Sequence, residues 1–290
     1  MSERYLAELD RALRERGAPR RLRTRFVGEA RDHLLEAEAE WRGVDFGDPA
    51  ALAQQLVDEL ASAQAKRSAL VVAAVLAPAA TLYLLLFVLA GAMHGSPDIF
   101  SGRDQTLALP AALALVLAPQ ISLAAGALAL LRVLRRRRQT VLPEAEVRVL
   151  VRRAATALGF GALTVAALAV YAYEYEAGLA PWWRVVAFAA PVALALPLGA
   201  ATVALGRTAR IRPAAPGRAG DLFADLPEAR VVAATPWRFC LPFAVGIAAA
   251  AFAGGVFGGN PAGGLRNAMA ETIAVVASFA ALGRFLGLRS

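Results

Sequence analysis

The sequence predicts an all-α polytopic membrane protein, in which six transmembrane helices follow a small cytoplasmic domain of three helices. Two observations predict this fold. Hydrophobic residues make up 58% of the 290 residues and charged residues only 19%, whereas an average soluble domain has about 45–50% apolar and about 25% charged residues. The apolar residues also gather in long uninterrupted segments, and the charged residues gather before and between these segments.

Six apolar segments are each long enough to cross a bilayer as a helix, for which about 20 residues are needed. Only two charged residues, Glu271 and Arg284, fall within them, both in the last segment. Together the segments define a transmembrane domain over residues 69–286. The predicted spans are residues 69–93, 107–131, 154–173, 185–205, 239–257 and 268–286.

The run from Arg132 to Arg138 sets the predicted orientation, because short basic loops stay in the cytoplasm. With both termini inside, 28 of the 31 lysines and arginines fall on the cytoplasmic side. We therefore expect a multi-pass protein of a bacterial cytoplasmic (plasma) membrane with both ends cytoplasmic. Four consecutive arginines are expected to contact anionic headgroups: Arg135, Arg136, Arg137 and Arg138.

The net charge of +8 does not indicate a nucleic acid partner. Residues 1–68 carry −1 and the remainder carries +9. The basic excess therefore belongs to the loops between spans, where orientation and anionic lipid explain it. No direct nucleic acid binding is expected.

Residues 1–65 are predicted to form a cytoplasmic module of three short amphipathic helices. The first covers residues 2–16 and ends at Gly17, and the second covers residues 20–43. Asp48, which is followed by a proline, is a suitable N-cap for the third. A bundle of this size is near the lower limit for independent stability, so we expect it to lean on the membrane face or on a partner.

Three motifs in this module resemble the HAAS-type helical signalling domain, also called a permease prefix domain, which precedes membrane segments in actinobacterial proteins. The likeness covers about residues 5–60. In one departure, only residues 42–45 stand where the family usually has a further helical stretch. The motifs are Tyr5-Leu-Ala-Glu-Leu-Asp-Arg-Ala-Leu13, Glu29-Ala-Arg-Asp-His-Leu34 and Phe46-Gly-Asp-Pro49.

The resemblance implies a role without catalysis. Proteins of this kind often accompany PadR-like transcription regulators or are fused to permease segments, and the module is associated with no catalytic residue. We therefore expect a regulatory or signalling protein that couples a membrane event to a cytoplasmic partner. The alternative is a permease-like transport component that works with a separate ATPase subunit.

Few residues qualify as partner-binding or regulatory sites. His33 is either a pH sensor or a histidine packed or hydrogen-bonded on its helix face. Asp48 is expected to act as a cap. Leu222 and Phe223 belong to residues 221–226, which are either a docking peptide or a short helix in the membrane interface.

Two ionisable residues lie near the ends of predicted spans. His94 follows the first span, and Glu271 lies about one turn from the outer end of the sixth. They could relay protons or bind a cation. Alternatively, both lie close enough to the interface to reach water.

Enzymatic chemistry is not expected. The sequence has one cysteine, two histidines and a single lysine without a phosphate-binding glycine motif. We therefore expect no cofactor and no metal, and an enzyme acting on lipid-linked substrates would lack a polar cluster. A homo-oligomer is possible. The glycines of residues 254–259 permit close helix contact, for which an internal contact is favoured over a dimer seam.

Overall fold

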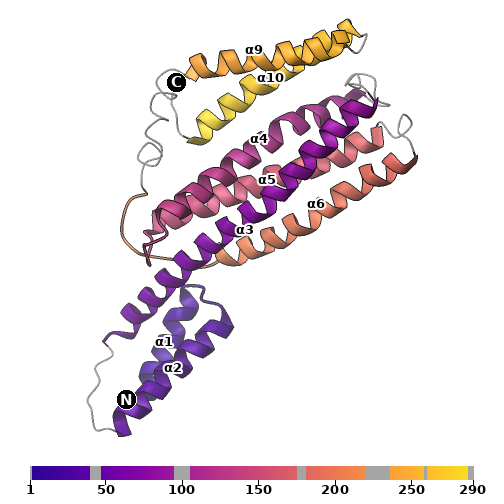
Figure 1. Ribbon diagram of the computed structural model, residues 1–290. Helices are drawn as coiled ribbons and strands as arrows, with labels where there is room; N and C mark the ends of the chain where they lie inside the picture. The colour runs from indigo at the N-terminus through magenta and orange to yellow at the C-terminus, as the bar shows by residue number, and fades with distance from the viewer. Residues whose placement is uncertain are drawn as a thin grey trace. The chain divides into compact units, whose positions relative to one another are not determined.

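The computed structural model describes residues 2–39, 47–94, 105–174, 181–219, 236–257 and 260–286. Within these ranges the chain is helical and contains no strand, which confirms the all-α fold class. The helices, labelled in Figure 1, are α1 (Ser2–Glu15), α2 (Arg20–Ala39), α3 (Pro49–His94), α4 (Gln105–Arg135), α5 (Glu144–Glu174), α6 (Pro181–Thr208), α9 (Pro236–Phe257) and α10 (Pro261–Leu286).

Four helices are long and apolar enough to cross a membrane. Their candidate spans are Pro49–Leu82 in α3, Pro110–Arg135 in α4, Glu144–Glu174 in α5 and Arg184–Thr208 in α6. Helices also form at the last two predicted spans, but α9 contributes only a shorter apolar stretch, Cys240–Ala253. The part of the chain that the structure describes therefore indicates a membrane protein with four candidate spans.

From the sequence, the third helix of the N-terminal module was predicted to be a separate short helix, but in the structure it is not separate. It continues without a break into the first predicted span, so that α3 is 46 residues long. Residues 50–77 contain neither glycine nor proline and are rich in alanine and leucine, which favour a helix. The polar residues near Lys66 therefore lie within a continuous helix.

The chain forms two compact units. The first, which we call the junction, comprises Met1–Leu70, Arg132–Arg152 and Val203–Gly220. The second comprises Val71–Leu131, Arg153–Thr202 and Asp221–Ser290. Each of the helices α3, α4, α5 and α6 contributes residues to both units.

In the second unit, the small residue Gly161 of α5 lets three other helices approach. A Cβ atom at Gly161 would lie 3.2 Å from Cδ2 of Leu198 in α6, 3.4 Å from Oγ of Ser122 in α4 and 3.6 Å from Cδ2 of Leu76 in α3. Ser122 also donates a hydrogen bond of 2.7 Å to the carbonyl of Ala157. Small residues at such contacts are typical of membrane helices.

Helices α9 and α10 form a hairpin (Figure 1). The backbones of Gly255 and Gly264 touch, since a Cβ atom at Gly255 would overlap Cα of Gly264. Asn260 caps α10, because its Oδ1 accepts from the amide of Gly263 at 2.9 Å. The expected internal contact of residues 254–259 is thus confirmed at Gly255.

Candidate functional site

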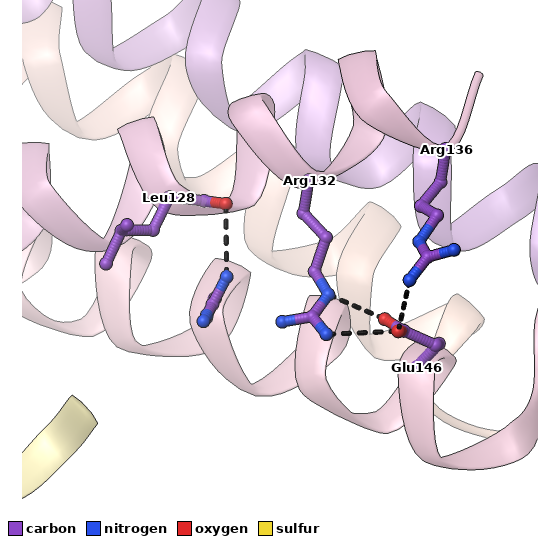
Figure 2. A network of polar contacts seen from close by, with 5 residues as sticks. Leu128, Arg132, Arg136 and Glu146 are labelled. Carbon is purple, nitrogen blue, oxygen red and sulfur yellow. Dashed lines mark hydrogen bonds and ion pairs between the residues drawn. The ribbon is translucent and has the colours of Figure 1, made fainter. Parts of the chain in front are cut away.

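A buried ion pair joins the end of α4 to the start of α5. Arg132 Nε lies 2.6 Å from Glu146 Oε2, and Arg132 Nη2 lies 3.0 Å from Oε1 (Figure 2). The two side chains are 2% and 3% exposed. A cation in the last turn of one helix and an anion in the first turn of the next each suit the local helix dipole. The pair therefore fixes the two helix ends that flank the α4–α5 connector, residues 136–143.

A second arginine approaches the same carboxylate. Arg136 Nη2 lies 3.7 Å from Glu146 Oε1, and the Arg136 side chain is 33% exposed (Figure 2). Its contact is longer than a hydrogen bond. Glu146 is thus held tightly by Arg132 and loosely by Arg136.

The α4–α5 connector is bonded to α3 through two side chains. The hydroxyl of Ser62 accepts from the amide of Leu142 at 2.8 Å and donates to the carbonyl of Asp58 at 2.7 Å. One turn farther along α3, Lys66 Nζ donates to the carbonyl of Gln139. Ser62 and Leu142 are buried, so the bonds of Ser62 are shielded from competing water, whereas the bond of Lys66 to Gln139 is exposed.

The segment after α6, residues 209–219, is bonded to the same helix, and we call it the α6 tail. Asp58 Oδ1 accepts from the amide of Ala214 at 2.7 Å, and the hydroxyls of Ser68 and Thr208 lie 2.8 Å apart. Asp58, Ser62 and Lys66 are four residues apart, which places them on one face of α3. This polar row holds the connector and the α6 tail together.

The α6 tail also contacts the end of α1. The amide of Arg212 donates to the carbonyl of Arg16 at 3.0 Å. Gly17, with φ of +77°, lies so close to the carbonyl oxygen of Arg210 that a Cβ atom there would overlap it. Arg16 Nη2 in turn donates to Gln54 Oε1 of α3 at 3.2 Å. The N-terminal helices, the connector and the α6 tail therefore form one bonded assembly.

The module residues named from the sequence contact their own helices. His33 is 70% exposed, and its Nδ1 lies 3.6 Å from Glu36 Oε2, so it is not packed on the face of α2. Asp48 is the expected N-cap of α3. Its Oδ1 and Oδ2 accept from the amides of Ala50 and Ala51, each at 3.2 Å.

The remaining sequence-predicted residues are scattered. Arg135, Arg137 and Arg138 are exposed. Glu271 is half-buried in α10, in the second unit. Three further positions lie outside what the structure describes: Leu222, Phe223 and the side chain of His94.

The polar row was missed from the sequence, although a signal for it exists. In the first half of α3, small apolar residues recur every four positions, and the structure buries them. Asp58, Ser62 and Lys66 recur at the same step directly beside them. A polar row next to an alanine row on one helix indicates polar contacts to neighbouring segments. The alanine row comprises Ala53, Ala61, Ala65 and Ala69, with Val57 between the first two.

The polar contacts of the junction join chain segments to one another. Its bonds join carboxylate, hydroxyl and guanidinium groups to backbone groups and to one another. Across the described ranges, no group of three or more histidine, cysteine, aspartate or glutamate side chains could hold a metal ion. The arrangement can transmit a displacement from one chain segment to another.

One comparison with known proteins identifies part of the chain. No curated protein and no solved structure matches it. Residues 4–55, which cover α1, α2 and the start of α3, match the HAAS family. The chain thus contains a HAAS domain that ends three residues before Asp58, where the polar row begins.

Proposed function

We propose that this chain is a membrane-embedded regulatory protein that couples a membrane event to a cytoplasmic partner through its HAAS domain. The observation that carries the proposal is the bonding of both the connector and the α6 tail to the N-terminal helices and α3. Asp58 holds Ala214, Ser62 holds Leu142, and Arg16 holds Arg212. A shift of α6 relative to α1 must therefore strain the contact of the α6 tail with Arg16 of the domain. A shift of α4 or α5 relative to α3 must strain the bond at Ser62, seven residues after the domain ends.

The proposed topology places six spans in a bacterial plasma membrane, with α9 and α10 as the last two and both termini in the cytoplasm. The distribution of lysine and arginine supports this orientation. The HAAS domain then lies where a soluble partner can reach it.

The proposed partner is a PadR-like transcription regulator, which the HAAS match supports. Direct contact of this chain with nucleic acid is not part of the proposal, since residues 1–68 carry a charge of −1. DNA would be bound by the regulator. A homo-oligomer is compatible with this scheme.

The second candidate is a permease-like component that works with a separate ATPase subunit. It is favoured by the prolines inside α3, α4, α6 and α9, because such prolines free carbonyls and create hinges in membrane helices. In this scheme the junction would receive force from the ATPase instead of passing a signal outward.

Affinity capture from native membranes separates the two candidates. The intact chain is compared with a chain that lacks residues 2–47, which keeps α3 and its polar row. A point variant, Leu35→Glu, changes a leucine that is 57% exposed on α2 and controls for damage caused by the deletion. Recovery of a transcription regulator only with the intact chain supports the regulatory proposal. An ATPase retained by both chains supports the alternative, and recovery of neither contradicts both.

A further inference from the structure

The two parts of the junction that contain the connector and the α6 tail are strongly basic. Residues 132–152 and 203–219 contain eleven arginines and two acids, Glu144 and Glu146. Both acids already have partners, because Glu144 Oε1 lies 2.8 Å from Arg148 Nη2 and Glu146 binds Arg132. Arginines therefore outnumber acids in these two segments by nine.

Two exposed arginines of the connector and two of the α6 tail are together called the basic rim: Arg137, Arg138, Arg212 and Arg218. Among the residues that the structure places, no acidic side chain forms an ion pair with them. The connector and the α6 tail are in contact, because a Cβ atom at Gly217 would lie 2.8 Å from Cγ of Pro143. The amide of Glu144 donates to the carbonyl of Ala215 at 3.0 Å.

The basic rim lies two to ten residues beyond the ends of two candidate spans. Pro110–Arg135 ends at the connector, and Arg184–Thr208 ends at the α6 tail. Arginines at the end of a span reach the headgroup layer. Guanidinium groups bind phosphate through paired N–H donors, so the ligand chemistry that fits the rim is a phosphate or phosphodiester anion.

Arg136 links this surface to α3. It follows the last residue of α4, and its 3.7 Å contact with Glu146 is the weaker of the two that this carboxylate receives. A phosphate beside Arg136 competes for its guanidinium, while Arg132 keeps Glu146 compensated. Three residues later, the carbonyl of Gln139 accepts from Lys66 of α3.

We propose that the basic rim binds the phosphate of anionic phospholipids and that Arg136 conveys this binding to α3 by leaving Glu146. The inference rests on the proposed function for its orientation, and it names the density of anionic lipid in the cytoplasmic leaflet as the membrane event. The bonds of Ser62 to Leu142 and of Lys66 to Gln139 loosen when the lipid is bound.

The test uses the full chain in nanodiscs of phosphatidylcholine, with and without about 30% phosphatidylglycerol, at low salt. Two quantities are measured: retained phosphatidylglycerol, by native mass spectrometry, and hydrogen exchange at the amide of Leu142. We expect phosphatidylglycerol to be retained and to speed this exchange about threefold or more. Retention without faster exchange overturns the role of Arg136, and no retention overturns the site.

Three variants separate the steps. Arg137→Gln with Arg138→Gln is expected to lose phosphatidylglycerol retention. Arg136→Gln is expected to keep it and to lose the response at Leu142. The control is Arg148→Gln, an exposed arginine of the same region that already pairs with Glu144, and it is expected to behave as the unaltered chain. If the control loses retention equally, overall charge and not the rim binds the lipid.

Inorganic phosphate added to discs of phosphatidylcholine distinguishes a lipid from a soluble ligand. We expect no effect on the exchange of Leu142, and a response equal to that with phosphatidylglycerol would contradict a lipid source. Affinity capture of the partner is scored separately. A lost lipid effect with a retained regulator overturns this inference alone, and a lost regulator with a retained lipid effect overturns the proposed function alone.

Discussion

Replacement of Gly17 by alanine should detach the α6 tail from the end of α1. Gly17 completes a Schellman-type end of α1, because the amide of Ala18 donates to the carbonyl of Leu13 and the amide of Gly17 donates to the carbonyl of Arg14, each at 3.0 Å. Its φ of +77° is costly for any residue with a Cβ atom, and that atom would also overlap the carbonyl oxygen of Arg210.

The expected magnitude follows from these two effects. An alanine in the left-handed region costs about 1–2 kcal/mol, and loss of the bond from Arg212 to Arg16 costs about 1 kcal/mol more. The sum of about 2–3 kcal/mol corresponds to an increase of about 30- to 150-fold in local opening, since about 1.4 kcal/mol is tenfold. Hydrogen exchange at the amide of Arg212, measured on the full chain in detergent, reports this opening.

Gly47 provides a matched control. It also has a positive φ, of +68°, but no described atom lies within 4 Å of where its Cβ would be. Gly47→Ala should therefore cost about 1–2 kcal/mol at the start of α3 and leave the exchange of Arg212 unchanged. If both variants affect Arg212 equally, or if neither does, the reasoning about the contact between α1 and the α6 tail is refuted.

Three further predictions concern single contacts. Glu146→Leu should destabilise the junction by about 3–5 kcal/mol, because it removes the carboxylate that the buried guanidinium of Arg132 binds. Adding Arg132→Met should restore part of the loss in thermal unfolding, and an equal loss in the double variant would contradict the pairing. Ser62→Ala should cost about 1–3 kcal/mol, since the amide of Leu142 loses its acceptor, and unchanged exchange at Leu142 would count against this bond. Gly255→Leu should separate α9 from α10, because the backbones of Gly255 and Gly264 are in contact. The yield of a cysteine cross-link between the two helices should then fall.

Local features of the fold were predictable because they depend on a few neighbouring residues. Asp48 and its following proline specify a helix start without reference to the rest of the chain, and Gly17 specifies a helix end in the same way. The length and apolarity of residues 154–173 likewise predict a span there, and Pro143 with the acids after it predicts that the helix begins before the span, as α5 does at Glu144.

The candidate site was not predictable to the same degree, because its contacts join residues far apart in the chain. Asp58 and Ala214 are 156 positions apart, and no local sequence pattern at either residue indicates that the two are in contact. Arg132 was interpreted only as the start of a basic cytoplasmic run, yet it is buried against Glu146. A run of arginines has the same composition whether its members face lipid or an acid, so the division between Arg132 and Arg137 arises only from folding.

We propose that the polar row of α3 links the α6 tail to the HAAS domain. Hydrogen exchange across α1 and the α6 tail in Asp58→Ala, compared with Glu59→Ala at the exposed neighbouring position, tests it most directly. The account predicts that Asp58→Ala speeds exchange at Ala214 and also at the amides of Gly17 and Ala18, while Glu59→Ala changes neither. Faster exchange confined to Ala214 would contradict the account, because the α6 tail would then move without affecting the domain.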